Sequence, residues 1–217
     1  GEVIKVHTPA QFPDPSTIKE IQEPWINIAL LTPSKYIGSI MEIVTQRRGL
    51  SKDIKYIGDE RVEMSFEMPL SNIIIDFYDK LKSVSSGYAS MNYELIGLRV
   101  GDLVKVDILV AGEKVDALAA IMHKTTAETD GRALVAKLKT LIPKQQFEIA
   151  IQAAIGAKVI ARESISALRK DVTTGLYGGD VTRKMKVLEK QKKGKKRMKK
   201  IGKVDIPQEA FLAVLKK

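Results

Sequence analysis

The sequence of 217 residues is 44% hydrophobic, contains no cysteine and has a formal net charge of +10. This length and composition predict a globular chain of one or two domains, and the lack of cysteine excludes disulfides, zinc knuckles and thiol nucleophiles. No run approaches the roughly 18 apolar residues of a membrane span, and the N-terminus does not resemble a signal peptide. We therefore expect a soluble, cytoplasmic protein.

Residues 1–22 are predicted to be the end of a preceding domain and a linker. Residues 2–6 have a strand-like composition, and we expect them to close a domain that lies upstream, because the chain starts at Gly1 rather than at Met. The segment from Pro9 to Pro15 is rich in proline, which favours an extended connector. The sequence therefore predicts a fragment of a longer protein.

A strand and a helix are predicted next. Residues 25–31 form an apolar run, Thr32 is a suitable N-cap, and Pro33 suits the first helical position. The apolar residues that follow at helical spacing are Ile37, Ile40, Met41 and Val44. At the end of this helix Arg47 and Arg48 either complement the helix dipole or contact RNA phosphate, and Gly49 can take a positive φ.

Two more strands and a second helix complete the first module. Residues 53–57 and 61–68 are predicted strands joined by a turn at Gly58, a helix starts near Leu70, and residues 89–95 alternate again. The side chains expected on the buried faces are Val62, Met64, Phe66, Met68, Ile74, Phe77, Tyr78, Leu81, Ala89, Met91, Tyr93 and Leu95. The order strand, helix, strand, strand, helix, strand predicts a ferredoxin-like split βαβ domain over residues 23–98.

A second α+β module is predicted over residues 99–168. Residues 104–110 and 115–122 form a predicted hairpin, residues 130–141 a helix, and residues 147–155 a further strand. The remaining residues, 169–217, are predicted to be a basic loop and a helical tail. Its last helix, residues 207–215, has Phe211, Leu212 and Leu215 available for packing.

The residues do not predict a catalytic site. The sequence lacks a P-loop, a dinucleotide-binding fingerprint and a Gly-x-Ser-x-Gly elbow. His7 and His123 are far apart and predict no metal site, and His123 is best explained as a structural residue at the end of a strand. We therefore assign no catalytic residue, metal or cofactor to this chain.

The positive charge is concentrated between Arg183 and Lys203. This stretch holds twelve Lys or Arg residues and one acid, Glu189, so residues 1–182 are close to neutral. A local cationic block of this kind marks a site for a polyanion, either nucleic acid or an anionic lipid surface. The stretch contains no Trp or Phe, which leaves a lipid-bound helix without insertion anchors. From Lys192 onward no apolar stripe remains and Gly194 interrupts the pattern, so we expect a solvated and partly disordered arm.

Several motifs resemble the C-terminal half of the LepA family of translational GTPases, also called elongation factor four. They include residues 23–49, 76–77, 81–83, 87–90, 115–118, 132–138, 142–147, 151–156, 160–163, 169–172, 177–180 and 206–215. The resemblance implies that 23–98 is similar to the C-terminal domain of elongation factor G and that 99 onward is a family-specific domain. It also implies a parent that binds GTP and Mg²⁺ through a missing N-terminal part, binds the ribosome and acts on tRNA position, with back-translocation as the proposed outcome.

These considerations predict an RNA-binding surface at the C-terminal end. Its candidate residues are Arg169, Lys170, Tyr177, Gly178, Gly179, Arg183, Lys184, Lys186, Lys190, Lys192, Lys193, Lys195, Lys196, Arg197, Lys199 and Lys200, with Arg47 and Arg48 as a further candidate contact to ribosomal RNA. Tyr177 can stack on a base, and Gly178 and Gly179 allow close approach of the backbone. The expected partners are ribosomal RNA and tRNA, with a peripheral anionic membrane as the alternative, and the chain is expected to be a monomer.

Overall fold

The computed structural model describes residues 2–74, 76–174 and 181–215, and the chain folds into two compact units. One unit consists of Asp14–Asp102, and the other of Gly1–Pro13 together with Leu103–Leu215. Both contain antiparallel sheets packed against helices, so the predicted α+β class is confirmed. The candidates Tyr177, Gly178 and Gly179 lie outside the described residues.

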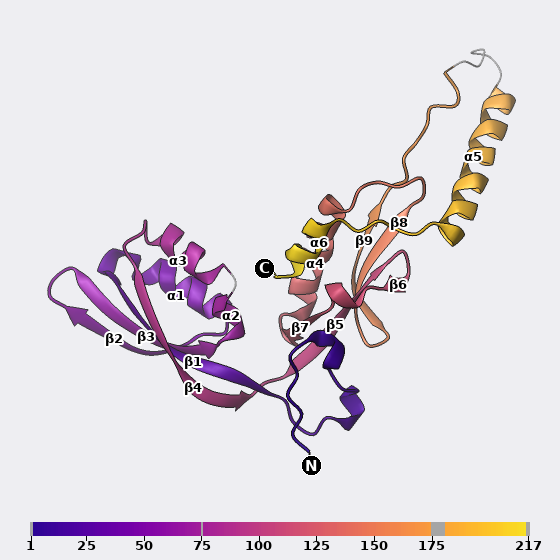
Figure 1. The fold of residues 1–217 in the computed structure, drawn as a ribbon. Coiled ribbons are helices and arrows are strands. Elements are labelled where there is room, and N and C mark those ends of the chain that lie inside the picture. The colour runs from indigo at the N-terminus through magenta and orange to yellow at the C-terminus, as the bar shows by residue number, and fades with distance from the viewer. Residues whose placement is uncertain (1, 75, 175–180, 216–217) are drawn as a thin grey trace. The chain divides into compact units, whose positions relative to one another are not determined.

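The unit Asp14–Asp102 is built on a four-stranded antiparallel sheet in the order β2-β3-β1-β4 (Figure 1). The strands are β1 (Gln22–Pro33), β2 (Leu50–Ile57), β3 (Arg61–Pro69) and β4 (Ser90–Val100). The helices are α1 (Ile37–Gln46), α2 (Ser71–Ile74) and α3 (Phe77–Val84), with short 3-10 turns η2 (Pro15–Thr17) and η3 (Ser34–Tyr36). This strand order and connectivity are those of a ferredoxin-like fold, as predicted.

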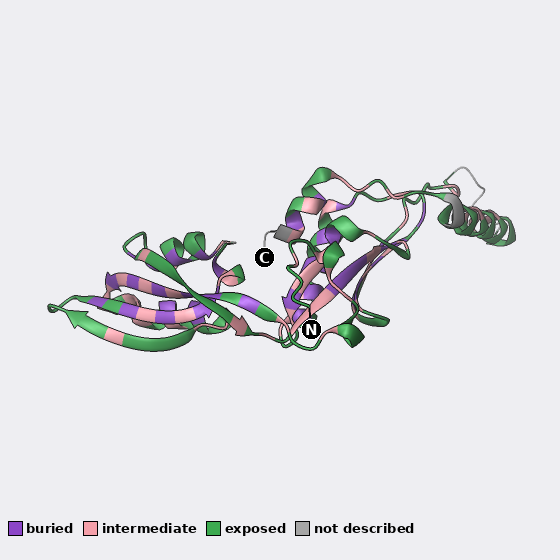
Figure 2. Cartoon of the chain, turned by 60° about the horizontal axis from the view of Figure 1, so that its bottom comes forward, coloured by how far each residue is buried: buried purple, intermediate pink, exposed green. Residues whose placement is uncertain are grey.

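The core of this unit lies between the sheet and helices α1 and α3. Along β3 every second residue was predicted to face inward. These residues are Val62, Met64, Phe66 and Met68, and all four are fully buried, which confirms the alternation in the sequence. The largest other contributions are Ile26, Ile28 and Leu30 from β1, Ile40 and Val44 from α1, and Phe77 and Leu81 from α3. Figure 2 shows buried residues alternating with intermediate or exposed ones along the central strands.

The start of the first helix differs from the prediction. Thr32 pairs with Val62 and Pro33 with Arg61, so β1 continues two residues beyond its expected end. The chain then passes through η3, and α1 begins only at Ile37. Pairing with β3 thus outweighs the capping preference of Thr32, since local propensities are weak compared with tertiary contacts.

The end of α1 also differs from the prediction. Arg48, not Gly49, takes the left-handed conformation, with φ 64°. Gly49 is required for another reason: a Cβ at this position would overlap the side chain of Val44, whose carbonyl oxygen accepts a hydrogen bond from the Gly49 N–H at 2.8 Å. The glycine therefore allows close packing of the chain as it leaves the helix.

Four side chains predicted to be buried are exposed. Ile74 is 70% exposed because Asp76 takes φ 50° and separates α2 from α3, so Ile74 does not share a helical face with Phe77. Tyr78 is 46% exposed because it lies on α3 about 100° round the helix from the buried Phe77. Tyr93 is 56% and Leu95 66% exposed because β4 is an edge strand, paired in the described sheet with β1 alone.

The second unit contains a five-stranded antiparallel sheet. The main path is β6-β5-β8-β9, and β7 also pairs with β5. The strands are β5 (Leu103–Val110), β6 (Glu113–Lys114), β7 (Ala120–His123), β8 (Ile149–Ile155) and β9 (Lys158–Ile165). The helices are α4 (Ala127–Leu141), α5 (Val181–Ile201) and α6 (Gln208–Leu215), with the 3-10 turns η1 (Pro9–Gln11) and η4 (Asp116–Leu118).

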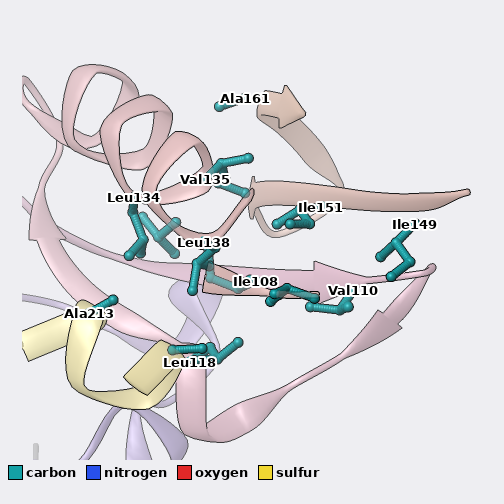
Figure 3. Packing of buried hydrophobic residues seen from close by; sticks show 14 of the residues in the cluster. Ile108, Val110, Leu118, Leu134, Val135, Leu138, Ile149, Ile151, Ala161 and Ala213 are labelled. Carbon is teal, nitrogen blue, oxygen red and sulfur yellow. The ribbon is translucent and has the colours of Figure 1, made fainter. Parts of the chain in front are cut away.

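The core of the second unit joins the sheet to α4 and α6 (Figure 3). The sheet contributes Ile108, Val110, Ile149 and Ile151, and α4 contributes Leu134, Val135 and Leu138. The helix α6 buries Ala210 and Ala213, whereas Leu212, which was expected to pack, is 50% exposed. The last helix is therefore part of the folded core and not part of a tail.

Two other features of this unit differ from the prediction. The expected strand 115–122 is divided into η4 and the short β7, while β6 lies before it and closes the turn at Ala111–Gly112. The strand β9, which pairs with β8 across the turn at Gly156, was not predicted.

Residues 2–7 pair with none of the described strands, and Val3 and Ile4 are exposed. A strand needs a partner for its backbone groups. The expectation that residues 2–6 close a domain upstream of this chain stays a prediction.

Candidate nucleic-acid interface

The basic segment forms one continuous helix, α5, of 21 residues. The expected disorder from Lys192 onward is not observed: the helix runs through Gly194 to Ile201. Lys, Arg, Gln, Met and Leu are all good helix formers, and a single interior glycine costs only about 1 kcal/mol relative to alanine. The sequence composition thus supports the helix despite its charge.

The cationic side chains are distributed around most of the circumference of α5. Those exposed in the structure are Arg183, Lys186, Lys190, Lys192, Lys193, Lys196, Arg197 and Lys199, while Lys184 and Lys195 are half-buried and the side chain of Lys200 lies outside the described part. Figure 2 shows α5 as an almost entirely exposed helix. Because neighbouring cations project in different directions, the helix can meet phosphate groups from more than one side.

Two hydrogen bonds fix the middle of α5 to the segment that follows β9. The side chain of Gln191 donates to the carbonyl oxygen of Lys170 at 2.8 Å, and Lys195 Nζ donates to the carbonyl oxygen of Leu168 at 2.5 Å. The side chains of Arg169 and Lys170 are exposed beside these bonds. The structure therefore brings two parts of the predicted RNA-binding set together, although they are separated in the sequence.

The end of α5 lies against Phe147. A Cβ on Gly202 would overlap the Phe147 ring, which is only 5% exposed. A groove of about 410 Å³ lies at this place, lined by Gln145, Gln146, Phe147, Arg197, Met198 and Gly202. The two glutamines beside Arg197 were not predicted as site residues; the sequence signal that included them was the motif of residues 142–147.

Asp171 holds the turn of residues 171–174. Its carboxylate accepts hydrogen bonds from the backbone N–H groups of Thr173 and Thr174, at 2.9 and 3.2 Å, and from the Thr173 hydroxyl at 3.1 Å. Hydrogen bonding, with the Thr174 side chain as the largest contributor, lowers the pKa of Asp171 to about 2. The carboxylate is therefore ionised at neutral pH and holds a turn rather than a proton.

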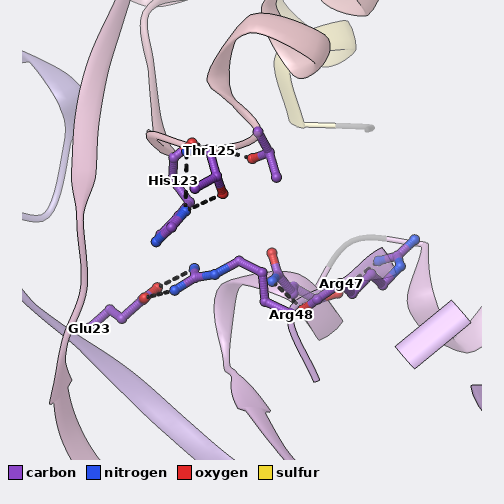
Figure 4. A network of polar contacts seen from close by, with 7 residues as sticks. Glu23, Arg47, Arg48, His123 and Thr125 are labelled. Carbon is purple, nitrogen blue, oxygen red and sulfur yellow. Dashed lines mark hydrogen bonds and ion pairs between the residues drawn. The ribbon is translucent and has the colours of Figure 1, made fainter. Parts of the chain in front are cut away.

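Arg47 and Arg48 both form ion pairs inside their own unit, and Figure 4 shows that of Arg48 with Glu23. Arg47 donates to the Asn72 carbonyl oxygen at 2.7 Å and to the Asp76 carboxylate at 2.5 Å, and Arg48 pairs with Glu23. Burial alone would raise the pKa of Asp76, but Arg47 and Lys80 together lower it. Of the two roles open from the sequence, this geometry favours the structural one, since a guanidinium held by a carboxylate is less available to phosphate.

The structure places His123 in a structural position. His123 ends β7 and its Nδ1 accepts a hydrogen bond from the Thr125 N–H at 3.3 Å (Figure 4). Within the described ranges, no cluster of three or more His, Cys, Asp or Glu residues could hold a metal ion. A search over the same part of the chain finds no helix with the length and apolar character to cross a membrane.

Comparison with known proteins matches almost the whole chain to two family models. Residues 20–109 match the elongation factor G C-terminus, and residues 110–216 match the GTP-binding protein LepA C-terminus. The boundary between these matches lies inside β5, seven residues beyond the boundary between the two compact units.

Three relatives named elongation factor 4 illustrate the similarity. The protein from Thermus thermophilus is 57% identical over 217 residues, that from Thermosynechococcus vestitus 56% over 216, and that from Leptospira biflexa 55% over 215. Each alignment covers 99–100% of this chain but only 36% of the relative, so the chain spans about a third of the length of these proteins. The chain therefore belongs to the LepA, or elongation factor 4, family and corresponds to the C-terminal part of its members.

Proposed function

We propose that this chain is the ribosome-binding C-terminal part of a translational GTPase and that α5 contacts RNA there. Its relatives are named as elongation factors, and one matching family model is named for a GTP-binding protein. The partners are ribosomal RNA and tRNA. GTP and Mg²⁺ belong to parts of the whole protein that do not align with this chain, so the chain contributes binding and positioning rather than hydrolysis.

The observation that carries this proposal is the cationic helix held against the folded unit. Exposed lysines and arginines occur along its whole length, and the bonds from Gln191 and Lys195 attach its middle to the segment 168–170. A rigid cationic helix can follow a phosphate backbone and release counterions, and it loses less conformational freedom on binding than a disordered arm. The folded units set where on the ribosome the helix can reach.

The resemblance to elongation factor 4 supports a proposal for the effect of this contact on translation. We propose that the helix helps to change the position of tRNA on the ribosome, with back-translocation under stress as the outcome in the whole factor. The side chains of α5 offer hydrogen-bond donors and positive charge, which suit positioning of a nucleic acid and not bond cleavage.

The test is a charge reversal on the exposed side of α5. In the 217-residue chain, Lys193, Lys196 and Arg197 are changed to Glu, and binding to ribosomes and to tRNA is measured between about 50 and 200 mM salt. An affinity that depends on phosphate contacts falls strongly over this range of salt concentration. We expect weaker binding and a plot of log affinity against log salt that is less steep by about 2 to 3, because each lost phosphate contact removes about 0.7 to 0.9 from the slope.

A matched variant controls for net charge. Lys19, Lys55 and Lys158 are also exposed, and changing them to Glu alters the net charge by the same amount. Equal losses in the two variants would contradict a specific role for α5. Unchanged RNA binding of the α5 variant combined with loss of binding to anionic vesicles would instead support the membrane alternative.

A further inference from the structure

A pair of stacked tyrosines lies on the surface of the ferredoxin-like unit and includes none of the residues assigned above. The rings of Tyr36 and Tyr88 have centroids 6.3 Å apart and an interplanar angle of 20°. Lys35 Nζ lies 4.9 Å from the Tyr36 centroid and 5.9 Å from that of Tyr88. Tyr88 is 67% exposed, so most of its ring is available to a partner.

The loop that carries Tyr88 is held firmly at the end of α3. The buried Ser85 hydroxyl donates to the Leu81 carbonyl oxygen at 2.7 Å and accepts from the Ala89 N–H at 3.1 Å. Between these anchors Ser86 and Gly87 both have positive φ, 51° and 81°. A non-glycine residue at positive φ is strained, and such strain is often found where a side chain is presented for function.

Ser86 of this loop also affects the ionisation of Tyr36. The hydrogen bond from Ser86 is the largest cause that lowers the pKa of Tyr36, and Lys35 adds to it. A second aromatic and lysine pair lies on the adjacent helix, where Lys82 Nζ is 4.5 Å from the exposed Tyr78 ring. The acid in the first turn of α3 is Asp79, which directly follows Tyr78. Consecutive helical residues project about 100° apart, so Asp79 and Tyr78 lie on different sides of α3.

We propose that Tyr88, stacked on Tyr36 and flanked by Lys35, is a platform for an unpaired RNA base. An exposed aromatic ring stacks on the face of any base, and an adjacent lysine meets the phosphate of the same nucleotide. A protein partner is less well matched, because the residues that surround Tyr88 in the loop are serine and glycine rather than aliphatic anchors. The inference rests on the proposed RNA-binding function and adds a second contact surface on the other unit.

The experiment uses photo-crosslinking in the 217-residue chain. Tyr88, Lys193 or Tyr56 is replaced by p-benzoylphenylalanine, and the protein is irradiated with a labelled 12-nucleotide oligoadenylate and, separately, with ribosomes. Lys193 reports the α5 contact. Tyr56 is the control, since it is 69% exposed on β2 of the same unit. We expect RNA crosslinks from positions 88 and 193, and a yield at 88 at least about fivefold above that at 56.

A second measurement tests stacking directly. In the α5 charge-reversal background, Tyr88→Ala is expected to weaken oligoadenylate binding about fivefold or more, the lower end of the range for base stacking. Tyr88→Phe is expected to retain binding because it keeps the ring, and Lys35→Gln to lower the salt slope by about 0.7.

The outcomes separate this inference from the proposed function. Crosslinks from position 193 but not from 88, or crosslinks from 88 to ribosomal protein alone, would overturn the tyrosine platform and leave the role of α5 intact. RNA crosslinks from neither position would overturn both.

Discussion

Arg48 and Glu23 form a two-bond ion pair that joins the end of α1 to β1. Arg48 Nη2 donates to Glu23 Oε1 at 2.5 Å, and Nη1 donates to Oε2 at 3.2 Å. Glu23 is only 4% exposed. The carboxylate is therefore buried with its charge compensated by one arginine, and this arginine is held at a positive φ.

We predict that Arg48→Ala lowers the free energy of unfolding of the unit Asp14–Asp102 by about 3 kcal/mol, because it leaves the buried Glu23 without its partner. Arg48→Gly should be less damaging by about 1 kcal/mol, because glycine accepts the positive φ. Trp25 is the single tryptophan of the chain and is buried in this unit, so urea unfolding followed by its fluorescence provides the measurement. Arg61→Ala, at an exposed position, should have little effect; equal losses at 48 and 61 would contradict the role of the pair.

The buried carboxylate of Glu23 also explains why residue 101 is a glycine. A Cβ added to Gly101 would lie 2.5 Å from Glu23 Oε1. Gly101→Ala should therefore destabilise the same unit by about 1 to 3 kcal/mol through overpacking. If the damage arises by displacing Glu23, it will not add to that of Arg48→Ala in the double variant, whereas full additivity of the two losses would show that the alanine acts elsewhere.

The two glycines at and after the end of α5 should respond in opposite ways. Gly194 has open space around its Cβ position, so Gly194→Ala should stabilise the helix by about 1 kcal/mol. Gly202→Ala should instead force the chain away from Phe147 and loosen the end of α5. Hydrogen exchange of the α5 amides measures both effects. Slower exchange in both variants would contradict the packing at Phe147.

Asp107 provides a prediction about pH. Burial alone would raise the pKa of Asp107, but hydrogen bonds from Lys114 and Lys105 together lower it below the ordinary value of 3.8. A carboxyl whose pKa is lower in the folded state stabilises the fold above its unfolded pKa, and this contribution is lost as pH falls through the folded pKa. The contribution should thus be complete above about pH 5 and decline below about pH 4.

We therefore expect Asp107→Asn to destabilise the second unit at pH 7 by about 1 kcal/mol, at the low end for bonds to a charged group because Lys114 is 57% exposed. The difference from the wild type should shrink as pH falls below 4. Hydrogen exchange of the β5 and β8 amides, at pH 7 and below about pH 4, measures this difference in stability. Glu148→Gln, at an exposed position, is the control; a difference for Asp107→Asn that does not change with pH would show that the carboxylate charge is not the cause.

The sequence was most informative where structure depends on local periodicity. The alternation around Phe66 predicted the buried face of β3, because period-two patterning requires no knowledge of distant residues. Thr32 and Pro33 were assigned to a helix because the capping signal is local, whereas their pairing with β3 depends on residues about 30 positions away. The exposure of Tyr93 and Leu95 depends on which strand lies at the sheet edge, which their own alternation does not encode.

The candidate RNA-binding site also has features that the sequence predicts and features that it does not. The charge of α5 is visible in the sequence, but its attachment through Lys170 and Leu168 and its contact with Phe147 arise only from the fold. The burial of Ala210 also has a practical consequence. Removal of residues 169–217 would take α6 out of the core, so substitutions within α5 test its function more cleanly than truncation.

A probe attached to α5 in the ribosome complex tests the proposed RNA contact most directly. Because the chain contains no cysteine, Lys193→Cys provides a unique attachment site for an iron–EDTA label that cleaves nearby RNA strands. If α5 contacts RNA, ribosomal RNA or tRNA will be cleaved at defined positions, and an excess of unlabelled chain will abolish this cleavage. If the labelled chain sediments with ribosomes but causes no more cleavage than free label, α5 does not contact RNA and the proposed function of this helix is wrong.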